Sequence, residues 1–127
     1  MEMRKGILIV DHGSRSMEAI WEFNEVVKML QEKHDDTKLI GAHMEINEPN
    51  IPDAIDEFLL AGIFEITVVP YFLFMGKHIK NDIPDILRNK KRSHPELIIN
   101  YTRPVGINPL LAEILSQRVD GPHWIQI

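Results

Sequence analysis

Gly6-Ile7-Leu8-Ile9-Val10 is an unbroken apolar run that stops at Asp11-His12-Gly13. A short run without alternating polar residues is typical of a strand covered on both faces, as in a parallel sheet. The segment after it has apolar residues at helical spacing, which predicts a helix of about 16 residues. Those residues are Met17, Ile20, Trp21, Val27 and Leu30. A strand followed directly by a helix is the first part of a βαβ unit.

The same order of strand and helix repeats along the chain. Further strands are predicted at residues 38–44, 66–69 and 97–101. Later helices are marked by candidate caps and apolar residues at helical spacing: Asn50 with Ile51, Ala54, Ile55, Phe58 and Leu59; Ile79, Ile83, Ile86 and Leu87; Asn108 with Leu111, Ile114 and Leu115. The strand starts lie about 30 residues apart, the size of a βαβ unit. The pattern predicts an α/β fold, an open parallel four-stranded sheet flanked by helices on both faces.

Composition narrows the function classes. The chain has 127 residues, a formal net charge of −5, six histidines and no cysteine. This length predicts one domain, and the acidic balance argues against a nonspecific nucleic-acid binder. Without cysteine, a transition metal must be held by histidine and carboxylate. No apolar run is long enough for a membrane span or a signal peptide, so we expect a cytoplasmic protein.

Polar side chains follow three of the predicted strands. His12 comes after the first strand, Glu45 after the second and His78 after the third. In an open parallel sheet, ligands bind beyond the carboxyl ends of the strands, so these side chains are expected to converge on one rim. Each residue alone is more often an ordinary loop residue or cap. Together they form a candidate two-histidine metal site.

Four motifs, in order, resemble those of the class II tetrapyrrole chelatases. Val10-Asp11-His12-Gly13-Ser14-Arg15 is similar to that family's H-G-S-R signature, and the segment 69–78, Val-Pro-Tyr-Phe-Leu-Phe-Met-Gly-Lys-His, to its V-P-x-F-L-x-x-G-x-H. Glu45 followed by Pro49, and the segment 106–110, also match. The resemblance spans residues 6 to about 119 and points to the short form, the small sirohydrochlorin cobaltochelatases and nickelochelatases. It implies one chelatase-like domain over residues 1–127 with flavodoxin-like βα repeats, ending in a tail at 120–127, that works as a homodimer.

The resemblance also implies an activity. The protein would insert a divalent metal (cobalt, or nickel or iron) into sirohydrochlorin, in cobalamin, sirohaem or nickel-tetrapyrrole synthesis. His12 and His78 would hold the metal, and Glu45 would be either a further ligand or the proton acceptor. No ATP and no cofactor beyond the substrate metal are expected. No nucleic-acid partner and no membrane partner are expected either.

The anionic tetrapyrrole needs donors for its carboxylates. Ser14, Arg15 and Lys77 are the candidates, with Lys80 and Arg103 predicted near the same rim. Phe72, Phe74 and Met75 are expected either to form an apolar wall for the macrocycle or to belong to the core or a dimer interface.

Several alternatives stay open. Asp11 departs from the small residue usual before the histidine, and either orients His12 or points to solvent. Asn24 falls on the predicted apolar face of the first helix, where it would need a hydrogen-bond partner. A metal carrier using the same histidines is the alternative function. The sequence around Ser14 lacks the G-x-S-x-G elbow that a serine hydrolase would need. It also lacks the phosphate-binding loop, rich in Ser, Thr and Gly, that a flavodoxin-type electron carrier would need.

Overall fold

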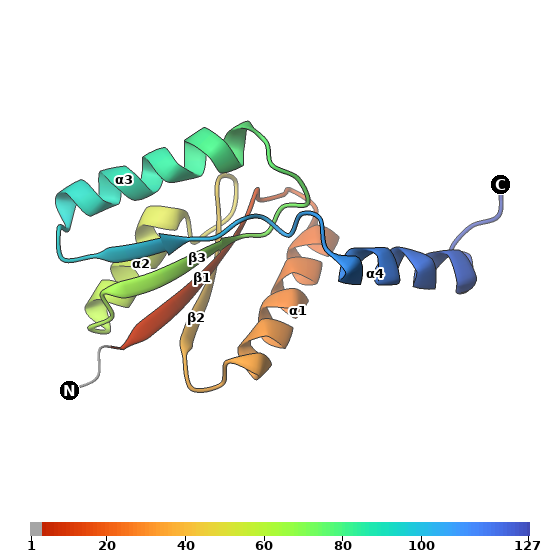
Figure 1. The fold of residues 1–127 in the computed structure, drawn as a ribbon, viewed down its shortest axis with the longest axis horizontal. Coiled ribbons are helices and arrows are strands. Elements are labelled where there is room, and N and C mark those ends of the chain that lie inside the picture. The colour runs from red at the N-terminus through yellow and green to blue at the C-terminus, as the bar shows by residue number, and fades with distance from the viewer. Residues whose placement is uncertain (1–3) are drawn as a thin grey trace.

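Four parallel strands form one sheet in the order β2-β1-β3-β4 (Figure 1). The computed structural model describes residues 4–127. Its strands are β1 (Lys5–Asp11), β2 (Lys38–His43), β3 (Glu65–Pro70) and β4 (Ile98–Tyr101). The last residues of β1 align with those of both neighbours, because Asp11 lies opposite His43 and Val10 opposite Pro70. Three strands therefore end at one edge of the sheet, and the predicted α/β fold is confirmed.

Helices cover both faces of this sheet (Figure 1). α1 (Met17–Lys33) lies on one face, and α2 (Ile51–Leu60) and α3 (Ile83–Ser93) lie on the other. Strand glycines let the helices approach closely: a Cβ on Gly6 would lie 2.5 Å from the Phe58 ring of α2, and one on Gly41 would lie 3.0 Å from the Phe23 ring of α1. Asn50 caps α2 as expected, and its side chain accepts a hydrogen bond from the Asp53 amide.

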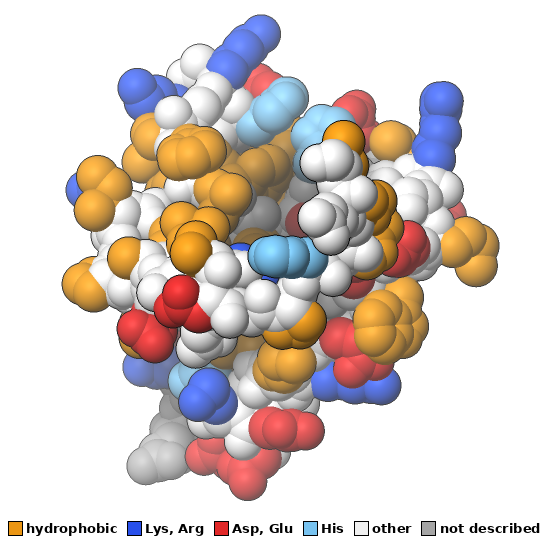
Figure 2. Space-filling view, turned by 90° about the vertical axis from the view of Figure 1, so that its right-hand side faces the viewer, with side chains coloured by type: hydrophobic (Ala, Val, Ile, Leu, Met, Phe, Trp, Pro, Cys, Tyr) orange, Lys and Arg blue, Asp and Glu red, His pale blue; other side chains and the backbone are white. Residues whose placement is uncertain are grey.

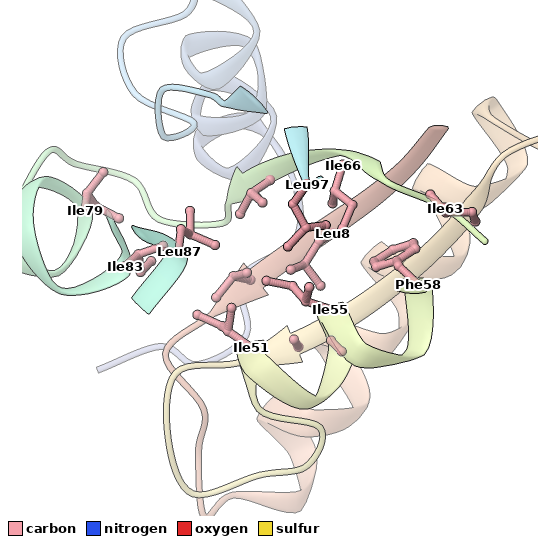
Figure 3. Close-up of a cluster of buried hydrophobic side chains, with 14 residues drawn as sticks. Leu8, Ile51, Ile55, Phe58, Ile63, Ile66, Ile79, Ile83, Leu87 and Leu97 are labelled. Atoms are coloured by element: carbon pink, nitrogen blue, oxygen red, sulfur yellow. The ribbon is translucent and has the colours of Figure 1, made fainter. Parts of the chain in front are cut away.

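The main core lies between the sheet and the pair α2 and α3 (Figure 3). Alternate residues of β1, Leu8 and Val10, point into it and are fully buried. The helices add a continuous apolar layer, whose largest buried members are Ile51, Ile55, Phe58 and Ile83. The α1 face buries less, because Phe23 is the one residue of α1 that is buried.

The predicted packed face of α1 is wrong in part. Met17 and Trp21 are 83% and 63% exposed, whereas Phe23 is buried and packs over Gly41. The missing side chain of Gly41 creates the space that Phe23 fills, and this contact sets the rotation of the helix. Asn24 is consequently exposed, so it does not need the hydrogen-bond partner expected for it on a buried face.

α4 (Pro109–Asp120) leaves the rest of the molecule and projects outward (Figure 1). It begins where Asn108 was expected to cap it, but none of its residues is buried. Of the apolar residues that marked this helix in the sequence, Ile114 and Leu115 are exposed, and so are Leu110 and Val119. Among residues 4–127, no helix is both long enough and apolar enough to cross a membrane.

A buried histidine and a partly buried aspartate pair at the carboxyl edge of the sheet. Asp11 Oδ1 is 2.5 Å from His43 Nδ1, and His43 is 5% exposed. The His43 ring also packs against Phe23, with ring centroids 5.1 Å apart. Asp11 therefore neither orients His12 nor points to solvent, because its carboxylate joins the ends of β1 and β2.

We expect Asp11→Ala to lower the free energy of unfolding by about 1–3 kcal/mol, since it leaves the buried His43 nitrogen without its partner. Urea denaturation measures this change. Asp35→Ala removes an exposed carboxylate and is the control, with an expected change below about 0.5 kcal/mol. Equal effects of the two substitutions would contradict this role of the pair.

Candidate functional site

The loops after β1 and β2 continue the pairing of the two strands. The Met44 amide donates to the Asp11 carbonyl at 3.0 Å, and the Glu45 amide donates to the His12 carbonyl at 3.2 Å. These bonds carry the register beyond the sheet and place Glu45 beside His12. Gly13 permits the close approach: its φ is +97°, and a Cβ there would lie 1.9 Å from the Glu45 carbonyl oxygen. A residue with a side chain does not fit at this position.

Asn47 completes the connection between these loops. Its side-chain oxygen accepts a hydrogen bond from the Ser14 amide at 2.7 Å. Its own amide donates to the Glu45 carbonyl at 2.8 Å, and the residue between them, Ile46, has a φ of +74°. Asn47 was not among the residues predicted from the sequence. The available signal was an asparagine two residues after Glu45, because Asn often bonds to neighbouring backbone in turns.

The three side chains expected at the rim lie close together. His12 Nε2 is 3.0 Å from Glu45 Oε1, and the His12 and His78 rings have centroids 5.2 Å apart with planes inclined at 58°. All three side chains are largely open to solvent, with exposed fractions between 44% and 61%. The structure thus places two imidazoles and a carboxylate on one accessible rim.

His78 reaches the rim from the segment that follows β3. It is the first residue of η1 (His78–Asp82), a π-helical turn that leads directly into α3. The helix predicted around Ile79, Ile83 and Leu87 therefore exists, but its first turn is wider than an α-helix. His78 Nδ1 lies 2.6 Å from Asp82 Oδ2, four residues further along the same turn.

This rim is open to solvent and does not form a complete metal-binding site. Among the residues that the structure describes, no group of three His, Asp or Glu side chains is arranged to hold a metal ion. The Glu45 carboxylate instead lies at ion-pair distance from the His12 ring, 3.0 Å from Nε2. Two neighbouring imidazoles with unfilled space around them suit an ion that arrives and leaves, because further coordination positions stay available.

The expected substrate-binding residues lie around the same loops. Arg15 and Lys77 are exposed; Arg15 lies three residues after His12, and Lys77 directly precedes His78. Ser14 is not part of the helix start, because Ser16 caps α1 by accepting from the Ala19 amide. The Ser14 hydroxyl instead accepts from the Ser16 amide. The Ser16 and Ala19 amides therefore already donate to hydroxyls of the protein itself and are not free for a substrate carboxylate.

Two hollows flank these loops. One, of about 430 Å³, lies between α1 and the site and is lined by Asp11, His12, Gly13, Ser14, Ala19, Glu22, Phe23, Val26, Tyr71 and Phe72. The other, of about 590 Å³, is lined by Leu73, Phe74, Met75 and residues 103–107. Backbone hydrogen bonds from Val105 to Phe72 and from Gly106 to Leu73 join the walls of the second. Figure 2 shows hydrophobic and histidine side chains together on the face from which α4 projects.

Two curated proteins are similar to this chain over most of its length. A chloroplastic sirohydrochlorin ferrochelatase of Arabidopsis thaliana is 37% identical over 114 residues, which are 90% of this chain and 51% of that protein. A sirohydrochlorin cobaltochelatase of Methanothermobacter thermautotrophicus is 34% identical, and the match covers 90% of each. The chain thus spans about half of the plant protein and nearly all of the archaeal one.

A solved structure and a family model agree with these matches. The sirohydrochlorin chelatase SirB of Bacillus subtilis subspecies spizizenii, in complex with cobalt, superposes with a TM-score of 0.83 at 27% identity. This match covers 92% of the present chain and 50% of the SirB chain. The CbiX family model matches residues 6–121. The resemblance seen in the motifs is therefore confirmed, and the chain belongs to the CbiX family.

Proposed function

We propose that this protein inserts a divalent metal, principally cobalt, into sirohydrochlorin. One observation carries the proposal: His12 and His78 lie side by side, with Glu45 in contact with His12, on an open rim at the carboxyl edge of the sheet. The relatives named as sirohydrochlorin chelatases support the same reaction. The metal is a substrate here, so a site that binds it without enclosing it suits the chemistry.

The two imidazoles hold the incoming ion in this mechanism. Neutral imidazole nitrogens replace part of the water around the metal, and the open side of the rim leaves positions for the pyrrole nitrogens. As the metal enters the ring, two pyrrole N–H protons must leave. A carboxylate close to the metal can accept them.

Glu45 is the proton acceptor in this proposal rather than a third ligand. Its carboxylate lies 3.0 Å from His12 Nε2, and no group of three His, Asp or Glu side chains is arranged to hold a metal among residues 4–127. Its side chain is 61% exposed, so a proton taken from the macrocycle can pass to solvent. One carboxylate can therefore remove both protons in succession.

The macrocycle would lie over the loops that border His78. The second hollow has an apolar wall that includes Phe74 and Met75, and Arg103 is among its lining residues. An apolar wall suits the face of the ring, and a guanidinium suits a peripheral carboxylate. Arg15, Lys77 and the Ser14 hydroxyl are proposed for further carboxylates.

The working unit in this proposal is a homodimer. α4 exposes apolar residues and buries none of them against residues 4–127, so a second copy is the partner that would cover it. The match to half of the longer SirB chain supports two copies per functional unit. In this proposal residues 1–127 are one chelatase-like domain. Its cytoplasmic location, use of nickel and independence of ATP stay predictions.

We expect His12→Ala and His78→Ala each to lower the rate of Co²⁺ insertion at least 100-fold, because each removes one of two metal-holding imidazoles. Anaerobic absorption spectra of sirohydrochlorin with Co²⁺ measure the rate. His34→Ala, an exposed histidine at the far end of α1, is the control and should keep the wild-type rate. Near wild-type rates for both site variants would show that His12 and His78 do not hold the metal. Wild-type protein that binds Co²⁺ without accelerating insertion would be a metal carrier instead.

The substitution Glu45→Gln tests whether Glu45 accepts protons or binds the metal. The amide keeps the size of the side chain but cannot take up a proton, so we expect kcat to fall about 100-fold or more. The dissociation constant for Co²⁺, measured by equilibrium dialysis, should change less than about threefold, a small fraction of the loss that follows removal of a ligand-orienting group. A parallel loss of Co²⁺ binding would identify Glu45 as a ligand.

Leu115→Glu tests the role of α4 in dimer formation. Leu115 is 65% exposed in the single chain, and placing a charge there should weaken the dimer about tenfold or more. Sedimentation velocity over a range of protein concentrations measures the dissociation. Gln117→Glu adds the same charge at an exposed polar position of the same helix and should leave the dimer intact. A wild-type protein that is monomeric and active would rule out the dimer.

A further inference from the structure

The turn that carries His78 has a wide hydrogen-bonding pattern that its sequence explains. The Ile83 amide donates to the His78 carbonyl, five residues back, instead of to Ile79. The next donor in this register would be Pro84, which has no N–H. The Ile79 carbonyl is satisfied from outside the helix, because the Tyr101 hydroxyl donates to it at 3.0 Å. A single π-type turn of this kind is frequent at functional sites.

Packing holds this turn in place. Ile79 and Ile83 are buried in the main core, so both ends of the turn are anchored. Burial raises the pKa of Tyr101 to about 12, so its hydroxyl keeps its proton at neutral pH and remains a donor. The backbone from His78 to Ile83 is therefore tied to β4 as well as to α3.

The contact between His78 and Asp82 determines which ring nitrogen of His78 is free. Asp82 Oδ2 lies 2.6 Å from His78 Nδ1. An ionised carboxylate can only accept a hydrogen bond, so Nδ1 must carry the proton. In a neutral ring the other nitrogen, Nε2, then has a free lone pair, the form in which imidazole binds a metal.

We infer that Asp82 is a positioning residue that keeps His78 in the Nδ1–H tautomer and so presents its Nε2 to the incoming metal. The inference rests on the proposed function for its purpose, but not for its geometry. Among residues 4–127, Asp82 forms its ion pair with His78 and none with His12 or Glu45, so it acts only through His78. The His12 ring differs. Its Nε2 faces Glu45, and no carboxylate among the described residues pairs with its Nδ1.

Histidine ring nitrogen NMR of the metal-free protein at pH about 8, above the reference pKa of imidazole, tests the tautomer directly. We expect the Nδ1–H form of His78 in the wild type and a shift toward Nε2–H in Asp82→Ala. Asp82→Glu retains a carboxylate and should retain the Nδ1–H form. Asp85→Ala removes an exposed carboxylate three residues further along, which pairs with Arg88, and should resemble the wild type.

Binding of Co²⁺ alone is measured on the same proteins. The dissociation constant should rise about 10- to 100-fold in Asp82→Ala, and Asp82→Glu should recover part of this loss. A wild-type His78 in the Nε2–H form, or an Asp82→Ala protein with unchanged tautomer and affinity, would overturn the inference. If the tautomers behave as expected but the wild type inserts no metal, the proposed function fails and the positioning by Asp82 stands.

Discussion

The parallel pairing of β1 with β2 and β3 is the constraint on which the site depends. It brings Asp11 opposite His43 and Val10 opposite Pro70, so the chain leaves three strands at the same edge of the sheet. Residues that are more than thirty positions apart in the sequence then become neighbours, as the hydrogen bond between Glu45 and His12 shows. A shift of one residue would turn every core side chain of the strand to the opposite face, so burial of Leu8 and Val10 protects the register.

Around this edge, the protein combines rigid backbone with accessible side chains. Gly13 and Asn47 join the first two loops, and the Tyr101 hydroxyl holds the turn that carries His78. The imidazoles and the carboxylate themselves remain about half exposed. Such a site keeps its groups at defined positions without enclosing a ligand. This combination agrees with a reaction in which the metal must be transferred to a second substrate.

Features that depend on local sequence could be predicted, whereas those that depend on contacts between distant segments could not. Strands, helix caps and the order of elements depend on local patterns, and Asn50 and the apolar run before Asp11 marked them correctly. The rotation of α1 depends on the space over Gly41, which lies in another strand, so Met17 and Trp21 were placed on the wrong face. His12, Glu45 and His78 could be named because each follows a predicted strand, and the family motifs pointed to the same residues.

The sequence by itself determined the α/β order, the absence of cysteine ligands and the positions of the candidate metal-binding histidines. These properties need only the chain's own order and composition. Tertiary structure decided which groups those histidines contact. It paired Asp11 with His43, brought Asp82 to His78 through a π-type turn, and left α4 without a layer to cover it. Each of these depends on how distant segments fill space and satisfy buried polar groups, which no local pattern contains.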